Sequence, residues 1–275
     1  MKSKYIIFSL TLVILVAISL LIINYFKTNN ISASTILAPL QASTTAYPKV
    51  EKFDVPVLMY HYIRNAEGED QLGKNLSVSP ANFAAHLKGL KDDNYQTIKL
   101  QDLADISRSE ISKVYFEKKK PLIITFDDGY DDAYTVAFPT LKKYGFIGTF
   151  FIIKDYIGRD GRLSQGQIDT MTNAGMEFGA HTLSHPDLTK INIDEVKNQI
   201  VNSKGEWSVF CYPAGKYNQD VINFIKEAGY LTAVTTKIGI ANENSDLFQL
   251  RRVRVENVSP QTLMDKISFA YEHGN

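Results

Sequence analysis

The chain has 275 residues, of which 44% are hydrophobic and 22% charged, a composition typical of a globular protein and not of a disordered or fibrous one. Thirty basic residues balance thirty acidic ones, so the chain lacks the basic excess that favours a nucleic-acid partner. Its single cysteine, Cys211, excludes an intrachain disulfide. A fold outside the cell would therefore depend on its hydrophobic core, and roughly 220 residues are enough to build one.

The first apolar segment is a candidate membrane anchor. Residues 5–26 contain no charged residue. As a helix they would extend about 33 Å, close to the bilayer hydrocarbon core of about 30 Å. Lys2 and Lys4 precede the segment, and only Lys27 follows it closely, which favours a cytoplasmic amino terminus. We expect residues 1–27 to form a cytoplasmic stub and signal anchor in the cell membrane, with an extracellular domain. The alternative is a cleaved signal peptide and a secreted protein.

A linker and one domain follow the anchor. Residues 28–54 are rich in Asn, Ser, Thr, Ala and Pro and have no sustained apolar period, as expected of a flexible tether. In residues 55–275, short β-rich runs alternate with amphipathic segments. The predicted strands are 57–60, 96–98, 121–126, 147–153, 176–180, 207–212, 230–235 and 249–255. Two predicted helices begin at residues 80 and 101, and a third ends at residue 144. Three more span residues 164–175, 193–203 and 219–228, and a last helix begins at residue 260.

This alternation favours parallel βα units. We predict an α/β fold, a (β/α) barrel of seven or eight parallel strands, with an open doubly wound sheet as the alternative. Helix-end signals support the pattern. Ser79 is an N-cap residue before Pro80, Ser164 begins a capping box, and Gly145 can end a helix. His86, in the middle of an amphipathic helix, is expected to lie on the surface.

Two carboxylates follow the strongest predicted strand, in the sequence TFDDGY. Asp127 and Asp128 would repel each other unless a cation or a proton lies between them. Because neighbouring strand residues point to opposite faces, both carboxylates can face one centre only if the chain bends there. Gly129 permits such a bend. The alternative is that the pair caps the helix that follows.

Two histidines follow a later strand, in the sequence HTLSHP. His181 and His185 are four residues apart, a spacing that places both rings on one face of a helical turn and lets them bind one metal ion. Pro186 would prevent that turn from extending. Taken alone, this spacing also occurs by coincidence.

A third turn, FCYPAGKY, follows the strand that ends near Tyr212. A turn of this kind can direct backbone N–H groups into a pocket, although an ordinary strand-to-helix turn explains it equally well. Cys211 is interpreted as a small buried hydrophobic residue and not as a nucleophile.

These residues combine into one hydrolytic site. Asp128, His181 and His185 would hold a divalent ion, most readily zinc, with cobalt, nickel or iron as alternatives. Asp127 would take a proton from the attacking water, and a backbone N–H of the Tyr212 turn would stabilise the oxyanion. His61, which follows the first strand of the domain, is the candidate proton donor to the leaving amine. A packed loop histidine is the alternative for His61.

The motifs TFDDGY, HTLSHP and FxYPxGxY resemble those of the NodB-type polysaccharide deacetylases, carbohydrate esterase family 4, over roughly residues 55–270. PVLMYH and LRRVRV resemble the branch that acts on poly-N-acetylglucosamine. The resemblance implies a distorted (β/α) barrel that removes acetyl groups from N-acetylglucosamine units. It also implies that Asp127 is the base, that Asp128 and the two histidines hold the metal, and that the amide of Tyr212 binds the oxyanion.

The sequence departs from the family pattern in two places. Many relatives carry an arginine in the third motif, near the position of Phe210 here. We hypothesise that Arg252 orients Asp127 instead. Many relatives also have a histidine acid near the carboxyl terminus, but nothing after Arg254 resembles that motif, which favours His61 in this role.

The sequence thus predicts a metal-dependent N-deacetylase acting on a β-linked N-acetylglucosamine polysaccharide outside the cell. One alternative is a peptidoglycan N-acetylglucosamine deacetylase. A glycoside hydrolase using two carboxylates is disfavoured, because adjacent residues rarely place them about 5–9.5 Å apart across a glycosidic bond. A carbohydrate-binding module without activity would leave the clustered metal ligands unexplained.

Overall fold

The structure, a computed structural model, describes residues 53–106 and 120–273. Within these two ranges, no helix is both long and apolar enough to cross a membrane. The predicted anchor at residues 5–26 and the predicted linker up to residue 52 lie outside the described residues. Asp54, assigned to the linker from the sequence, begins strand β1 instead.

The structure differs from the predicted element pattern mainly by a few added short elements. The strands are β1 (Asp54–Val55), β2 (Val57–Tyr60), β3 (Tyr95–Thr97), β4 (Lys120–Phe126), β5 (Thr149–Ile152), β6 (Glu177–Ala180), β7 (Val209–Cys211), β8 (Thr232–Ile238), β9 (Ala241–Asn242) and β10 (Leu250–Arg254). The helices are α3 (Gln71–Leu76), α4 (Pro80–Asp92), α5 (Asp102–Ile106), α7 (Phe138–Tyr144), α8 (Gln165–Asn173), α9 (Ile193–Lys204), α10 (Gln219–Glu227) and α11 (Pro260–His273). A π-helical turn, η1 (Ala133–Ala137), and two 3₁₀ turns, η2 (Lys154–Tyr156) and η3 (Pro213–Gly215), complete the described elements.

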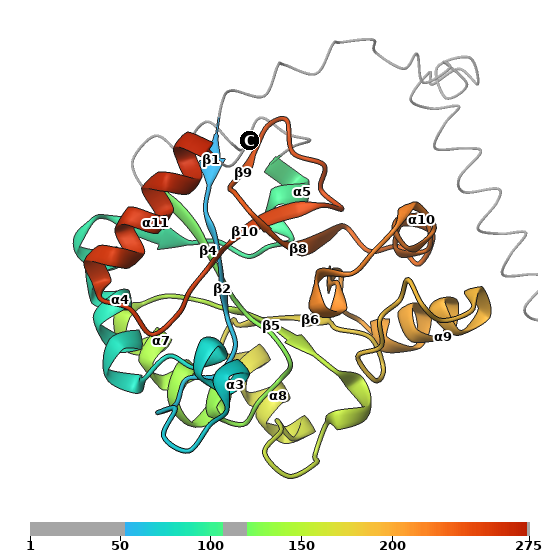
Figure 1. The fold of residues 1–275 in the computed structure, drawn as a ribbon, viewed down its shortest axis with the longest axis horizontal. Coiled ribbons are helices and arrows are strands. Elements are labelled where there is room, and N and C mark those ends of the chain that lie inside the picture. The colour runs from blue at the N-terminus through green and yellow to red at the C-terminus, as the bar shows by residue number, and fades with distance from the viewer. Residues whose placement is uncertain (1–52, 107–119, 274–275) are drawn as a thin grey trace, which may run out of the picture. The chain divides into compact units, whose positions relative to one another are not determined.

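Seven parallel strands close into a barrel (Figure 1). Their order is β2-β10-β8-β7-β6-β5-β4, and pairing between β4 and β2 completes the ring. Strand β3 lies beside the ring and pairs with the first half of β4. The short strands β1 and β9 form a separate antiparallel pair, which the sequence did not predict. The predicted (β/α) barrel is confirmed, and closure excludes the open sheet.

Alternate residues of the strands fill the barrel interior. Val57 and Ile123 share one buried cluster with residues of β5, β7, β8 and β10, which can meet only inside the ring. Side chains alternate between the two faces of a strand, so the same inward positions recur every second residue. At the carboxyl ends of β2, β4 and β7 this alternation reaches His61, Asp127 and Cys211. The strand pattern therefore brings these three side chains together at one mouth of the barrel.

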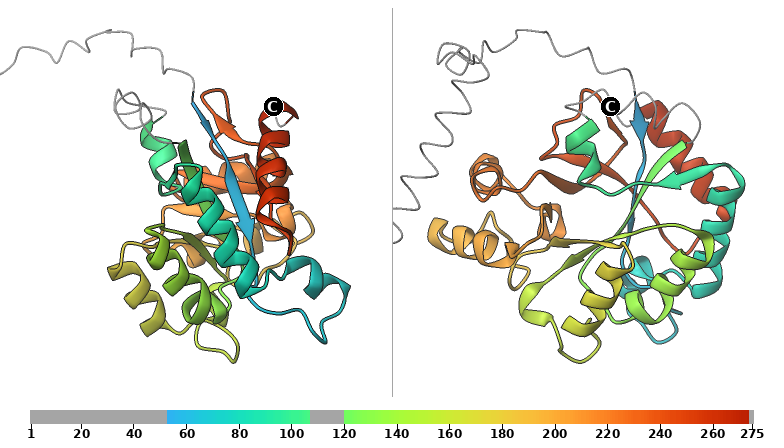
Figure 2. Two further views of the ribbon diagram at one scale, coloured as in Figure 1. Left: turned by 90° about the vertical axis from the view of Figure 1, so that its left-hand side faces the viewer. Right: turned by 180° about the vertical axis from the view of Figure 1, so that it is seen from behind.

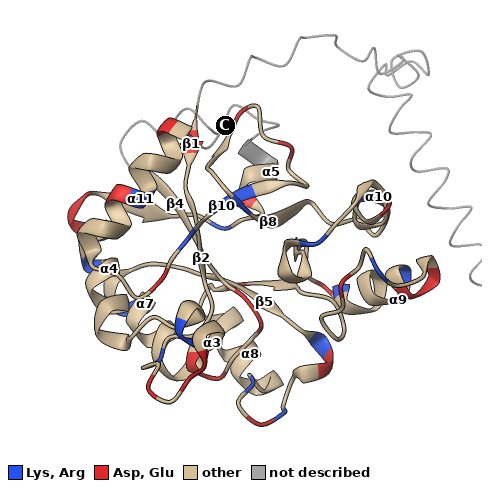
Figure 3. Ribbon diagram, in the orientation of Figure 1, with Lys and Arg blue, Asp and Glu red and all other residues tan. Residues whose placement is uncertain are grey.

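Helices cover the outside of the barrel (Figures 1 and 2). Helix α4 contacts both α7 and α11, and α9 contacts α10. Figure 3 shows acidic and basic residues interspersed over the described elements, in agreement with the neutral composition.

The predicted helix-end signals are confirmed. The Ser79 hydroxyl accepts a hydrogen bond from the N–H of Asn82 at the start of α4. Ser164 and Gln167 form both hydrogen bonds of a capping box at the start of α8. Gly145 ends α7 with a left-handed φ of 73°. These local features agree with the global fold at each position.

The prediction that His86 lies on the surface is wrong. The residue is 1% exposed, because it falls on the same stripe of α4 as Phe83 and Leu87. Its Nδ1 lies 3.2 Å from the hydroxyl of Tyr60, and its Nε2 lies 2.8 Å from the carbonyl oxygen of Val258. A polar ring is tolerated at this core position because both nitrogens have partners.

Burial makes His86 a source of acid sensitivity. Desolvation lowers the pKa of its ring, although the Val258 carbonyl partly opposes this. The unfolded chain therefore binds the proton first as pH falls below about 6.5, and the free energy of unfolding decreases. We expect His86→Gln to reduce the loss of stability between pH 6.5 and 5.5 by up to about 1 kcal/mol. Urea unfolding of both proteins at the two pH values measures this, and equal losses would contradict the assignment.

Candidate active site

Two adjacent carboxylates stand at the carboxyl end of β4. Asp127 continues the inward alternation of the strand, whereas Asp128 and Gly129 have left-handed φ angles of 76° and 70°. This bend allows both carboxylates to line the same pocket. A Cβ on Gly129 would lie 2.9 Å from Cδ1 of Ile152, so a larger residue would not fit there without a shift. The bend expected at Gly129 thus begins one residue earlier.

Asp128, His181 and His185 converge at this mouth of the barrel. Oδ1 of Asp128 lies 3.3 Å from Nε2 of His181 and 3.6 Å from Nε2 of His185. One ligand atom from each residue lies within 4.8 Å of the other two. Two imidazole nitrogens and one carboxylate oxygen suit Zn²⁺ and neighbouring first-row metals. The structure therefore brings together the three residues that the sequence assigned to one ion.

A second possible ligand set shares one histidine with the first. Asp127, His181 and Cys211 also offer atoms within 4.8 Å of one another. However, both oxygens of Asp127 lie 2.8 Å from the guanidinium of Arg252, whose charge opposes a cation. Burial raises the pKa of the Cys211 thiol, whereas metals bind the thiolate. Asp128 and the two histidines are therefore the better metal set.

Strand β7 orients the ring of His181. Its Nδ1 lies 2.7 Å from the carbonyl oxygen of Cys211, which can only accept a hydrogen bond. Nδ1 therefore carries a proton, and Nε2 is the nitrogen that faces Asp128. A backbone carbonyl used in this way fixes the tautomer and orientation of a metal-binding histidine.

The two histidines lie on a loop between β6 and α9 and not on the helical turn that their spacing suggested. Thr182 and His185 have left-handed φ angles of 66° and 63°. The Thr182 hydroxyl oxygen accepts a hydrogen bond of 2.9 Å from the backbone N–H of His185. The side-chain oxygen of Gln199, on α9, accepts hydrogen bonds of 3.0 Å from the backbone N–H groups of Leu183 and Ser184. Hydrogen bonds within the loop and to α9, and not helical periodicity, set the shape of the loop that carries the two histidines.

Asp127 is buried against Arg252, as hypothesised from the sequence. Nη1 and Nη2 of Arg252 each lie 2.8 Å from one carboxylate oxygen. The same guanidinium also donates to the carbonyl of Thr235 and the hydroxyl of Thr125. Burial alone would raise the pKa of Asp127, but the charge and hydrogen bonds of Arg252, together with the charges of His61 and His181, outweigh burial and hold that pKa below its usual range. The carboxylate is therefore charged, and the two hydrogen bonds fix its orientation, a geometry that suits the orienting role hypothesised for Arg252.

Cys211 is completely buried beside this pair, as predicted. Its sulfur lies 3.4 Å from Nη2 of Arg252 and 3.6 Å from Oδ2 of Asp127. A small side chain at this position leaves room for a guanidinium that arrives from β10.

His61 stands at the end of β2, next to the predicted base. Its Nε2 lies 3.8 Å from Oδ2 of Asp127. Burial lowers the pKa of His61, although the charges of Asp127 and Asp128 oppose this effect. Once protonated, the ring is a stronger acid than a solvated histidine. Its position and acidity fit a proton donor, which remains a prediction.

The turn after β7 offers a different amide from the one predicted. The N–H of Tyr212 donates to the carbonyl of Val234 at 3.3 Å, so it belongs to the sheet. Pro213 has no N–H, and Ala214 follows with a left-handed φ of 50°. Among the described residues, no group accepts a hydrogen bond from the N–H of Ala214, which lines the same pocket as Asp128. The oxyanion role therefore fits Ala214 and not Tyr212, because sheet hydrogen bonding continues one residue past β7.

The pocket over these groups has a volume of about 580 Å³. Tyr62, Leu72, Tyr130 and Arg254 also line it, and the sequence analysis did not single them out. Tyr62 and Tyr130 belong to the motifs that hold His61 and the two carboxylates, so proximity in sequence could have indicated them. Leu72 lies on α3, which has no such signal.

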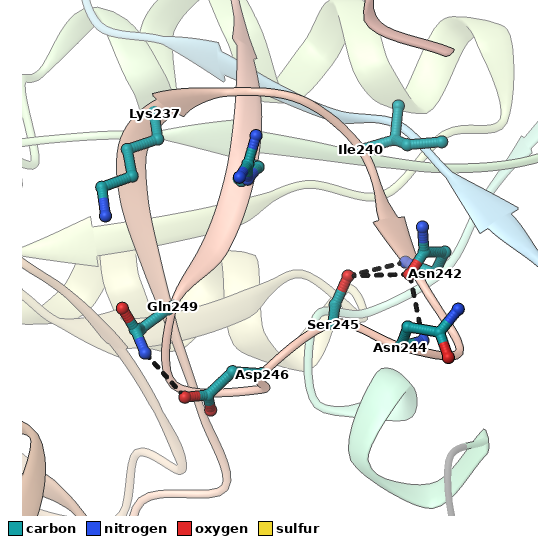
Figure 4. Close-up of a pocket in the computed structure, with 8 residues that line it drawn as sticks. Lys237, Ile240, Asn242, Asn244, Ser245, Asp246 and Gln249 are labelled. Carbon is teal, nitrogen blue, oxygen red and sulfur yellow. Dashed lines mark hydrogen bonds between the residues drawn. The ribbon is translucent and has the colours of Figure 1, made fainter. Parts of the chain in front are cut away.

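A second cleft, of about 390 Å³, lies between β8, β10 and the segment that joins them (Figure 4). Polar side chains dominate its lining, including Lys237, Asp246 and Gln249. The Asp246 carboxylate accepts a hydrogen bond from the Gln249 amide. None of the predicted catalytic or metal-binding residues lines this cleft.

A closed parallel barrel with a two-histidine, one-carboxylate site at its mouth has the architecture of a metal-assisted hydrolase. Residues 116–233 match the family model described as polysaccharide deacetylase. YxkH of Bacillus subtilis, a protein named for the same activity, is 34% identical over 225 residues, which cover 77% of this chain and 75% of YxkH. The poly-β-1,6-N-acetyl-D-glucosamine N-deacetylase of Staphylococcus epidermidis is 27% identical, over 78% of this chain and 84% of that protein.

A solved structure gives the same assignment. The Streptococcus pyogenes deacetylase PplD, in complex with acetate, is 31% identical and superposes with a TM-score of 0.71, covering 78% of this chain and 98% of PplD. IcaB from Ammonifex degensii, at 21% identity and a TM-score of 0.63, shares the fold over 79% of this chain and 97% of its own. The chain belongs to the polysaccharide deacetylase family, the hydrolases of carbohydrate esterase family 4.

Replacement of Arg252 tests its positioning role. Arg252→Lys keeps the charge but loses the two parallel hydrogen bonds to Asp127. We expect acetate release to fall about tenfold or more, by analogy with other orienting partners, while divalent-ion affinity stays unchanged. Arg251→Lys, at the neighbouring arginine of the second cleft, is the matched control. Wild-type turnover by Arg252→Lys would show that the two parallel hydrogen bonds from Arg252 do not orient the base.

Proposed function

We propose that this protein removes N-acetyl groups from a β-linked N-acetylglucosamine polysaccharide, with one divalent ion, most readily zinc, held by Asp128, His181 and His185. The main support is that these three side chains converge beside a second carboxylate, Asp127, whose charge is balanced by Arg252. When bound there, such an ion supplies Lewis acidity, which activates water and polarises an amide carbonyl.

The remaining residues divide the proton transfers between them. Asp127 is charged and faces the pocket, so it can accept the proton of the attacking water. The N–H of Ala214 can donate to the oxyanion that forms on the acetyl carbonyl. Nε2 of His61 lies 3.8 Å from Oδ2 of the base and can deliver a proton to the departing amine. These steps together release acetate and leave a free amine on the sugar.

The polymer is inferred from the relatives and the pocket. Relatives in two staphylococcal species are named poly-β-1,6-N-acetyl-D-glucosamine N-deacetylases. The pocket volume of about 580 Å³ lies within the range of about 300–1,000 Å³ that organic ligands occupy. Leu72 is exposed and offers apolar surface for a sugar ring, and Tyr62 and Tyr130 line the same pocket. We therefore favour a polysaccharide of acetylated glucosamine.

The proposed location is the outer side of the cell membrane, with residues 5–26 as the anchor. The uncharged apolar composition of that segment supports the proposal. Protease added to intact cells should digest the domain and leave cytoplasmic proteins intact. A domain protected until the cells are lysed would contradict this location.

Acetate release is the direct test of the activity. We expect the full-length protein to release acetate from β-1,6-linked N-acetylglucosamine oligomers faster than from muropeptides. A chelator should abolish release, and added Zn²⁺ or Co²⁺ should restore it, because the ion activates the water. Faster release from muropeptides would favour a peptidoglycan deacetylase, and release that survives complete metal removal would contradict the metal site.

Three variants separate the roles of the site residues. Asp128→Asn should weaken ion binding, whereas Asp127→Asn and His61→Ala should bind the ion but lose about 10²–10⁴-fold in turnover, the usual contribution of an acid or base. Asp131→Asn and His273→Ala, which alter exposed side chains, are the matched controls. Full activity in His61→Ala would place the proton donor elsewhere.

A further inference from the structure

Arg162 contacts the backbone of the predicted metal ligand Asp128. Arg162 lies in the loop between η2 and α8, and its Nη1 donates to the carbonyl oxygen of Asp128 at 2.7 Å. The guanidinium carbon lies 3.9 Å from the ring centre of Tyr130 and 5.1 Å from that of Tyr156. A planar cation held by aromatic rings and a hydrogen bond has little freedom to move.

The conformation of Asp128 explains why such a contact matters. Its φ of 76° lies in the left-handed region, which non-glycine residues adopt at a cost of about 1 kcal/mol or more. If the strand stayed extended, the side chain of Asp128 would point to the opposite face from that of Asp127. The bend instead turns the Asp128 carboxylate toward His181 and His185. A hydrogen bond to the peptide carbonyl that follows the bend stabilises that conformation.

Backbone contacts hold the loop of Arg162 against the turn. Tyr130 and Arg162 form an isolated antiparallel β-bridge. On one side of this bridge the N–H of Leu163 donates to the carbonyl of Gly129 at 3.0 Å, and on the other the N–H of Asp131 donates to that of Gly161 at 3.1 Å. The position of the guanidinium is therefore set by the backbone as well as by its own contacts.

A stack of side chains continues from Arg162 to the loop that carries the predicted acid. The rings of Tyr130 and Tyr62 lie 3.9 Å apart, and the guanidinium carbon of Arg64 lies 3.6 Å from the ring centre of Tyr62. Tyr62 directly follows His61. The same stack thus joins the turn of the two carboxylates to the end of β2.

We infer that Arg162 is a positioning residue for the metal site: it fixes the left-handed turn that directs the Asp128 carboxylate toward the two histidines. This inference rests on the proposed metal dependence. It adds a residue that neither the motifs nor the ligand set contains. Because Arg162 acts through the backbone of Asp128, its loss should weaken ion binding before it affects the chemical step.

Cobalt titration of the metal-free, full-length protein tests the inference. Arg162→Met keeps a long unbranched side chain beside Tyr130 and removes the donor. We expect Co²⁺ affinity to fall about tenfold or more, as for other supporting residues of metal sites. Arg162→Lys retains a donor and should recover part of that affinity. At saturating Co²⁺ the Met variant should approach wild-type turnover.

The matched control is Arg159→Met, because Arg159 lies on the same loop and its exposed side chain packs on the ring of Tyr156, away from Asp128. Its Co²⁺ affinity should equal that of the wild type. Equal affinity in Arg162→Met, even with a lower melting temperature, would overturn the positioning role and leave the proposed function intact. Failure of the wild-type protein itself to bind Co²⁺ would instead overturn the proposed metal dependence.

Discussion

Two carboxylates next to each other on the chain need two separate positive partners. Asp127 has its partner within the protein, since both of its oxygens bind the buried guanidinium of Arg252. Asp128 faces two histidine nitrogens instead, a set that the proposed divalent ion would complete. The left-handed turn at Asp128 separates these two environments. This separation lets one carboxylate take the proposed role of base and its neighbour the proposed role of metal ligand.

The barrel makes this division possible. Arg252 is fully buried and comes from β10, more than a hundred residues after Asp127, yet strand closure brings both to the same mouth. An isolated buried arginine would be strongly destabilising, and the bidentate pair offsets that cost. Cys211 is small enough to leave space for the pair. The site thus depends on closure of the ring and not on any single loop.

Much of this arrangement could be predicted from the sequence, because strand alternation and motifs are local. The parallel strands, the capping box at Ser164 and the two histidines follow from spacing and residue type. The amide of Ala214 could not be separated from that of Tyr212, since only the sheet decides which N–H is already used. The prediction for His86 was wrong because the sequence of an amphipathic helix does not show whether a buried partner, here the hydroxyl of Tyr60, is available to its histidine. Helix α3 and the contact of Arg162 depend on packing between distant segments, which no local pattern encodes.

The central claim is that Asp128, His181 and His185 share one divalent ion that Asp127 does not touch. Anomalous diffraction from crystals of the zinc-loaded protein, recorded at the zinc edge, tests it most directly. The account predicts a single peak about 2.0–2.2 Å from one oxygen of Asp128 and from Nε2 of both histidines, with Asp127 still bound to Arg252. A peak bridging Asp127, His181 and Cys211, or an ion bound to both carboxylates, would contradict it.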